Sequence, residues 1–165
     1  MLEVAKSIDS YKETLISVME LIKPRRIFEW GSGGSTLRMA NHPTVLSVDS
    51  VEHDREWMEK LKDVLDQPKI KVHYSPYPDI YPYVDGRYER YHLIFIDGRE
   101  REECLREAKG RKLLEGGVVI LHDAERERYQ EPMRLFSYII LTDDGHTAVL
   151  TDDYKRHLEL KEKLL

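Results

Sequence analysis

Acidic and histidine side chains stand where several apolar runs of this chain end. Glu29 lies late in the run 26–30, Asp97 follows the run 91–96, and His122 and Asp123 close the run 118–121. Carboxylate and imidazole groups can act as acids and bases, or as ligands of a divalent cation such as Mg²⁺. Ordinary polar strand ends are the alternative. Because a strand as apolar as LIFI or VVIL gains nothing structurally from a terminal carboxylate, we treat Asp97, His122 and Asp123 as candidate catalytic residues.

A glycine-rich loop follows the first of these runs directly, in the stretch FEWGSGGST. Glycine accepts positive φ and, lacking a Cβ, lets a ligand approach the backbone. The helix expected to begin near Ser35 adds free N–H groups. A simple tight turn would give the same pattern. The candidate cofactor-binding residues of the loop are Gly31, Ser32, Gly33, Gly34 and Ser35.

Two acids follow the second apolar run at a spacing typical of ribose recognition. Asp49 lies 18 residues after Gly31 and Glu52 lies 21 residues after it. An acid about 20 residues beyond a glycine loop can accept both hydroxyls of a ribose. The same stretch could instead cap the next helix, with Asp54 at its first turn. The sequence leaves open which acid binds and which caps.

The order of apolar segments predicts an α/β fold. Strand and helix patterns alternate from residue 26 to residue 122, which favours a mostly parallel sheet between two helical layers, a three-layer α-β-α sandwich. Asp144-Gly145 between two apolar runs predicts an antiparallel C-terminal hairpin. In such sheets ligands bind beyond the carboxyl ends of the strands, where the candidate residues lie. The expected helices span 35–41, 53–65 and 100–114. The expected strands span 26–30, 44–49 (with Glu52 as an alternative end), 69–74, 91–97 and 118–123.

Length and composition indicate one domain over residues 1–165. It would comprise an N-terminal helical segment (1–23), a core (26–151) and a C-terminal helix (152–165). The net charge of −5, with arginines spread among glutamates, argues against nucleic acid as the main partner, although a local basic patch stays open. The single cysteine, Cys104, excludes an intramolecular disulfide and reads as a packed helical residue. No apolar run reaches the roughly 18 residues of a membrane span, so we expect a cytoplasmic protein.

The segment 75–90 is rich in proline and tyrosine and has no helical period. Loops of this length are usually functional or mobile. Rigid rings with hydroxyl tips suit a small polar-aromatic or sugar-like acceptor. Cover of the sheet edge, or an interface between two copies in a homodimer, would explain the same residues. The candidate substrate-binding residues are Tyr77, Tyr81 and Tyr83.

Taken in order, FEWGSGGST, the acids around EHDREW, LIFIDG and LLEGGVVILHDAER resemble the S-adenosylmethionine-dependent methyltransferases with a Rossmann-like fold, of the small-molecule type. The resemblance covers about residues 27–151. It implies that Glu29 lies near the methionine part of the cofactor, that Asp49 or Glu52 holds the ribose, and that Asp97 lies beside the sulfonium and the acceptor hydroxyl. In metal-dependent members, acids at the two later strand ends bind magnesium. Asp97 and Asp123 occupy comparable positions, but Ala124 stands where a further ligand usually follows.

Other functions fit the sequence less well. A nicotinamide enzyme prefers G-x-G-x-x-G, whereas Thr36 occupies the last of these positions. No N-P-P-Y-type signature follows the fourth strand, which argues against methylation of base or glutamine amino groups. A non-catalytic module that binds S-adenosylmethionine or a nucleoside is the remaining alternative. We expect His122 to point away from its neighbour Asp123, because adjacent residues of a strand face opposite sides.

Overall fold

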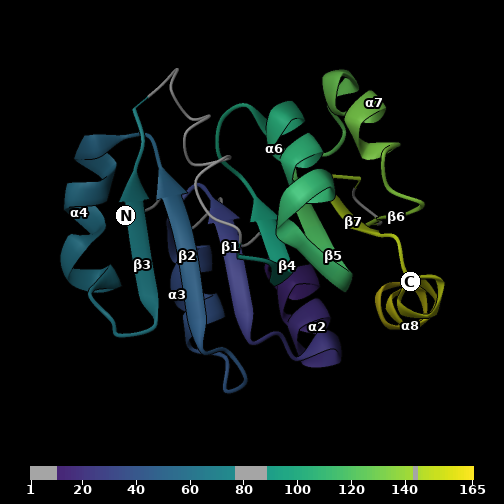
Figure 1. Cartoon of the computed structure of the whole chain (residues 1–165), viewed down its shortest axis with the longest axis horizontal. Coiled ribbons are helices and arrows are strands. Elements are labelled where there is room, and N and C mark those ends of the chain that lie inside the picture. Colours follow the sequence, from purple (N-terminus) through teal and green to yellow (C-terminus); the bar gives the residue numbers. More distant parts are fainter. Residues whose placement is uncertain (1–10, 77–88, 143–144) are drawn as a thin grey trace.

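The computed structural model describes residues 11–76, 89–142 and 145–165. These residues form a seven-stranded sheet in the order β3-β2-β1-β4-β5-β7-β6 (Figure 1). Strands β1 to β5 are parallel, and β7 pairs antiparallel with both β5 and β6. The strands are β1 (Arg26–Trp30), β2 (Ser47–Glu52), β3 (Ile70–Tyr74), β4 (Tyr91–Ile96), β5 (Leu113–His122), β6 (Tyr138–Leu141) and β7 (Thr147–Thr151).

Helices cover both faces of the sheet, which confirms the three-layer α/β architecture with its C-terminal hairpin. In Figure 1, α3 is seen behind β2 and α6 in front of β5. One layer contains α2 (Lys12–Ile22), α3 (Gly34–Ala40), α4 (Arg55–Leu65) and α8 (Tyr154–Leu164). The other contains α6 (Arg101–Glu107), a π-helical turn (Ala108–Lys112), a 3-10 turn (Glu127–Tyr129) and α7 (Gln130–Met133).

The apolar strands of the sequence become the centre of the core because the sheet buries them on both faces. In β4, Leu93 and Phe95 pack under the α2–α3 layer, while Ile94 and Ile96 pack under α6. All four side chains are fully buried. Alternation along a strand produces these two faces, and parallel strands need apolar residues on both. The carboxyl ends of β1, β2, β4 and β5 therefore sit on a rigid base.

Two predicted boundaries are wrong. Strand β2 was expected to begin at residue 44 and to end at Asp49 or slightly later at Glu52; it begins at Ser47 and ends at Glu52. The helix expected over 100–114 ends as α-helix at Glu107, and Gly116 and Gly117 lie inside β5 rather than ending that helix. The β4–β5 register shifts between Tyr91 and Leu93, and Gly116 adopts a positive φ of 71°. An irregularity of this kind requires glycine, and sequence pattern alone does not distinguish it from a helix end.

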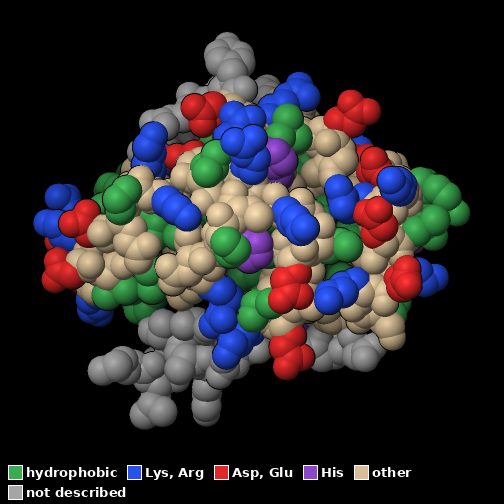
Figure 2. All heavy atoms as spheres, turned by 90° about the horizontal axis from the view of Figure 1, so that it is seen from below, with side chains coloured by type: hydrophobic (Ala, Val, Ile, Leu, Met, Phe, Trp, Pro, Cys, Tyr) green, Lys and Arg blue, Asp and Glu red, His purple; other side chains and the backbone are tan. Residues whose placement is uncertain are grey.

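Figure 2 looks toward the amino ends of the parallel strands, where basic side chains are scattered over the face with acidic and neutral groups between them. Within the described ranges, no helix has the length and apolar character needed to cross a membrane. Cys104 is fully buried in α6, as its helical pattern predicts, and burial raises the pKa of its thiol.

Candidate functional site

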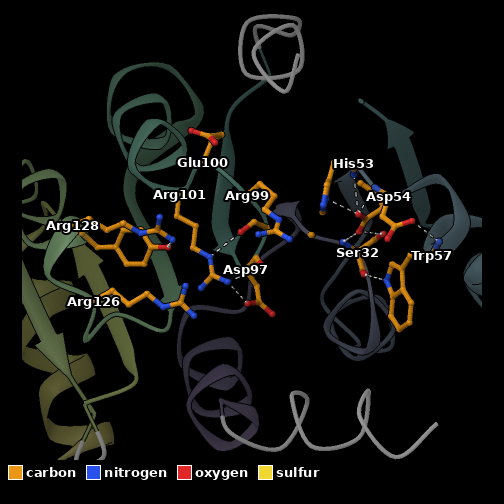
Figure 3. A pocket seen from close by; sticks show the side chains of 14 residues that line it. Ser32, His53, Asp54, Trp57, Asp97, Arg99, Glu100, Arg101, Arg126 and Arg128 are labelled. Atoms are coloured by element: carbon orange, nitrogen blue, oxygen red, sulfur yellow. Dashed lines mark hydrogen bonds and ion pairs between the residues drawn. The ribbon is translucent and has the colours of Figure 1, made fainter. Parts of the chain in front are cut away.

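A cleft of about 830 Å³ opens at the carboxyl ends of β1, β2 and β4. It has two chemically different sides (Figure 3). What we call the tryptophan side consists of Ser32, Glu52, His53, Asp54 and Trp57. What we call the arginine side consists of Arg99, Glu100, Arg101, Arg126, Arg128 and Tyr129. Asp97 lies between them, and Gly31 and Gly98 also line the cleft.

The first glycine of the loop is required by the chain itself. Gly31 has a φ of 98°, and a Cβ placed there would lie 2.9 Å from the backbone nitrogen of Gly98. The ends of β1 and β4 come this close because the Asp97 N–H donates to the Trp30 carbonyl (2.9 Å). At Gly33, in contrast, a Cβ would meet nothing within 4 Å. Gly31 thus joins two strand ends tightly, while the backbone at Gly33 borders open space.

Glu29 does not line the cleft. Its carboxylate is fully buried and accepts hydrogen bonds from three hydroxyls: Ser35 on Oε1, and Thr36 (2.5 Å) and Ser50 (2.8 Å) on Oε2. Thr36 Oγ1 also accepts the Gly33 N–H at 2.8 Å. Burial raises the pKa of Glu29 to about 7, against the lowering effect of the three hydroxyls. Glu29 and Ser35 therefore fix the shape of the loop from below.

Glu52 lies on the cleft wall and ties the loop to the end of β2. Its Oε2 accepts the N–H of Ser32 (3.0 Å) and the Ser32 hydroxyl (3.1 Å). Its Oε1 accepts the N–H groups of His53 and Asp54 at 2.8 and 2.9 Å. The Trp57 indole N–H donates to the Ser32 carbonyl (2.8 Å), which fixes the ring beside the cleft. The Ser32 hydroxyl can rotate away, so a ligand hydroxyl can replace it on Glu52.

The second acid of β2 faces the other way. Asp49 is buried among the α6-side core and accepts a hydrogen bond from the Tyr91 hydroxyl at 3.1 Å. Since Asp49 and Glu52 are three residues apart on one strand, they point to opposite faces of the sheet. Asp54 caps α4 by accepting the Trp57 N–H (3.0 Å). Of the two acids considered for the ribose, only Glu52 borders the cleft.

Asp97, His122 and Asp123 converge at the ends of β4 and β5. His122 Nδ1 lies 2.9 Å from Asp97 Oδ1 and 3.7 Å from Asp123 Oδ1. The expectation that His122 points away from Asp123 is wrong, because Asp123 has a positive φ of 54° and the strand alternation ends there. A carboxylate can only accept, so the tautomer with hydrogen on Nδ1 satisfies the pair. Tyr11 packs edge-on against His122, with 4.9 Å between ring centroids.

Arg101 occupies the space between the two aspartates. Its guanidinium lies 3.1 Å from Asp97 Oδ1 and 3.1 Å from Asp123 Oδ2. It also donates to the carbonyls of Asp97 (3.2 Å), Gly98 (2.9 Å) and His122 (2.5 Å). Ligand atoms of Asp97, His122 and Asp123 lie within 4.8 Å of one another, a spacing that could hold an ion. With a guanidinium bonded to both carboxylates, this arrangement does not fit the predicted Mg²⁺.

The other arginines of the cleft gather on the same side, although the sequence suggested an ordinary solvated surface. Arg126 pairs with Asp123 Oδ2 at 2.8 Å. Arg128 donates to the Tyr129 hydroxyl (2.8 Å) and lies over its ring, 4.9 Å from the centroid. Arg99 is exposed, in the loop before α6. The spacing Arg99-x-Arg101 and Arg126-x-Arg128 just after two strand ends is the sequence signal that could have identified this cluster.

Several predicted residues are not brought into the cleft. Gly31, Ser32, Glu52 and Asp97 line it, whereas Glu29, Ser35 and Asp49 are buried elsewhere. Gly34 is the first residue of α3. The candidate acceptor residues Tyr77, Tyr81 and Tyr83 lie outside the described residues. Sequence reasoning missed Trp57, Tyr11 and the arginines.

Solved structures share this architecture at low sequence identity. A spermidine synthase in complex with a transition-state analogue matches with a TM-score of 0.72 and 16% identity, over 91% of this chain and 61% of its own. A methyltransferase-like protein from Silicibacter pomeroyi matches at 0.63 and 19%, over 92% and 93% of the two chains. A putative O-methyltransferase from Klebsiella pneumoniae matches at 0.66 and 17%, over 88% and 81%. No family model and no curated protein matches the sequence.

These likenesses establish the fold, which is the Rossmann-like fold of methyltransferases. The chain spans about 61% of the length of the spermidine synthase that it matches. Because a spermidine synthase and a precorrin decarboxylase share the fold with methyltransferases, the fold alone does not determine the reaction. The reaction has to be argued from the cleft.

Proposed function

We propose that this protein transfers a methyl group from S-adenosylmethionine to a hydroxyl group of a small molecule. One observation carries the proposal: the carboxylate of Asp97 lies between the two sides of the cleft with one oxygen uncommitted. Its Oδ1 is bonded to His122 and Arg101. Within the described residues, Oδ2 has no hydrogen-bond partner. An oriented carboxylate with a free oxygen beside a glycine loop suits an acceptor hydroxyl.

The tryptophan side is the proposed place of the nucleoside. Glu52 would accept the ribose hydroxyls in place of the Ser32 hydroxyl, with the indole of Trp57 beside them. The backbone from Gly31 to Gly33 would then follow the remainder of the cofactor, because the open space at Gly33 leaves room against the chain. The five residues of the tryptophan side offer carboxylates, a hydroxyl and aromatic rings, which suit an uncharged ribose. They include no Lys or Arg that would bind a pyrophosphate. The loop therefore suits S-adenosylmethionine better than a dinucleotide.

When bound, the cofactor would supply an electrophilic methyl carbon, with S-adenosylhomocysteine as the leaving group. Asp97 would hold the acceptor hydroxyl on Oδ2, align its oxygen and receive its proton. His122 would donate from Nδ1 and keep the Asp97 carboxylate oriented. Arg101 would supply the positive charge that a divalent cation supplies elsewhere. No metal enters this scheme.

A pair of matched variants tests the cofactor site by calorimetry with S-adenosylmethionine and S-adenosylhomocysteine. Glu52→Gln should weaken both affinities by about 10- to 100-fold, the worth of a hydrogen bond to a charged group. Asp49→Asn, on the same strand but the other face, should change them less than about twofold. Equal effects in the two variants would contradict the placement of the ribose at Glu52. Absence of binding to the wild-type protein would contradict the function.

A panel of hydroxylated acceptors separates an enzyme from a non-catalytic binding module. The proposed function requires formation of S-adenosylhomocysteine that depends on the acceptor. Tight binding of the cofactor without turnover of any acceptor would favour the module.

A further inference from the structure

We infer that the acceptor of this cleft is an anion, held through a carboxylate or phosphate group by Arg99 and Arg128 on the arginine side. This rests on the proposed function, because it names the substrate class of the same site. Four arginine side chains converge on this part of the cleft (Figure 3). Two of them are ion-paired with neighbouring aspartates, and the other two have no ion-pair partner among the described residues.

The distribution of ion pairs identifies the arginines that are available. Arg101 is committed to Asp97 and Asp123. Arg126 is paired with Asp123 as well. Among residues 11–76, 89–142 and 145–165, no carboxylate lies within ion-pair distance of Arg99 or Arg128. Their guanidinium groups line the cleft and can receive an anionic ligand without first breaking an ion pair.

Arg128 is also held in place. The Tyr129 ring is almost fully buried and lies beneath the Arg128 guanidinium, while its hydroxyl accepts from Arg128 Nη2. Arg101 lies 6.0 Å from the centroid of the same ring. Stacking of this kind reduces the entropy lost when the guanidinium binds a ligand. A planar, preoriented guanidinium matches the two oxygens of a carboxylate or phosphate.

Charge complementarity favours an anion over other acceptors. The cofactor brings a sulfonium cation to Asp97, and the four arginines of the arginine side outnumber its one carboxylate, Glu100. A cationic acceptor, such as a polyamine, would be repelled by both. An anion would be attracted by both and would be oriented with its hydroxyl toward Asp97. The amino ends of the strands show only scattered basic groups (Figure 2).

A carboxylate on this side could come from a second source, the amino-acid part of the cofactor itself. The test therefore uses the double variant Arg99→Gln/Arg128→Gln, with Arg106→Gln as control. Arg106 lies on α6 with exposed partners, Glu103 and Glu131, and does not line the cleft.

Inorganic pyrophosphate is titrated into protein saturated with S-adenosylhomocysteine. We expect saturable binding to the wild type, at least about 10-fold weaker binding to the double variant, and a change below about twofold for Arg106→Gln. No saturable binding to the wild type, or equal binding to the double variant, would overturn the inference.

A second arm distinguishes the sources by comparing S-adenosylmethionine with 5′-methylthioadenosine, which lacks the amino-acid part. If the arginines serve the acceptor, the double variant binds both nucleosides as the wild type does. If the double variant loses affinity for S-adenosylmethionine alone, the arginines bind the cofactor, and the inference of an anionic acceptor is overturned. If neither nucleoside binds the wild type while pyrophosphate binds through the arginines, the proposed function fails but the anion site stands.

Discussion

The two sides of the cleft hold their carboxylates by different means. At the ends of β1 and β2, Glu29 lies buried beneath the cleft among three hydroxyls, and Glu52, on the cleft wall, accepts backbone N–H groups and one hydroxyl. On the side of β4 and β5, Asp97 and Asp123 share the guanidinium of Arg101, and Arg126 also pairs with Asp123. Neutral donors shape one side, and charge compensation shapes the other.

This difference separates two tasks. Hydroxyls can exchange with the hydroxyls of a ligand at little cost, so the first side suits an uncharged sugar. Paired charges hold each other in place, because separating them would leave a partly buried charge without compensation, which costs free energy. The second side therefore suits a side chain that must keep one orientation, such as Asp97. Each prediction below removes one group from one side.

The largest effect is expected for Asp97→Ala, which removes the uncommitted oxygen between the two sides. Methyl transfer should fall by at least about 100-fold, because alignment and proton acceptance are both lost. Binding of S-adenosylhomocysteine should persist, since the tryptophan side is unchanged. Initial rates and calorimetry on the same preparation measure the two quantities. Transfer at the wild-type rate would sink the assignment of Asp97.

The second prediction concerns the pH dependence of stability through Glu29. Its pKa rises from 4.5 to about 7 on folding, so the folded state favours the protonated form. The stabilising contribution is therefore complete below pH 4.5 and is lost as the pH rises through 7. The loss is on the order of 3 kcal/mol, from about 1.4 kcal/mol per pKa unit.

Urea unfolding of the wild type and Glu29→Gln between pH 4.5 and 8 measures this effect. The amide variant cannot ionise, so its stability should decline less with rising pH. Parallel pH profiles for the two proteins would show that Glu29 remains charged in the fold.

A smaller loss is expected for Arg101→Met, which leaves the carboxylates of Asp97 and Asp123 without their shared cation. The free energy of unfolding should fall by about 2 kcal/mol, below the value for fully buried pairs because both aspartates are partly exposed. Arg106→Gln removes only exposed ion pairs and should leave the denaturant midpoint nearly unchanged.

Denaturant unfolding with and without EDTA measures the stability of these proteins. EDTA should leave the free energy of unfolding of the wild type unchanged, because the cation between the two aspartates is the Arg101 side chain. A wild-type protein destabilised by EDTA would restore the metal hypothesis.

The sequence predicts this architecture well because local signals and burial agree. Apolar runs such as 91–96 can only be buried strands, and the glycine loop and the strand-end acids follow from chain order. The features that the sequence does not predict are those set by backbone conformation and by contacts between distant segments. The register of β4 and β5 pairs Ile96 with Leu121 and so brings Asp97 beside His122, while the αL conformation of Asp123 lets its side chain lie near the same histidine; no pattern of residue types predicts that conformation.

The roles of individual acids depend on strand length in the same way. Ending β2 at Asp49 would have placed that residue at the edge of the sheet, but the strand continues for three more residues. Glu52 consequently reaches the cleft and Asp49 does not. Arg101 was not singled out by its sequence pattern, and the short loop after Asp97 places it between the two aspartates.

The smallest effect separates two neighbours on the tryptophan side, Glu52 and Asp54. The Asp54 side chain caps α4 through the Trp57 N–H, so Asp54→Ala should lower the free energy of unfolding by about 1 kcal/mol. Asp54→Ser should recover most of this loss, because serine is also a good N-cap. Neither change should alter the affinity for S-adenosylhomocysteine by more than about twofold, whereas Glu52→Gln should. If Asp54→Ser is stable but binds the nucleoside poorly, then Asp54 rather than Glu52 holds the ribose, and neutral donors alone do not define this side.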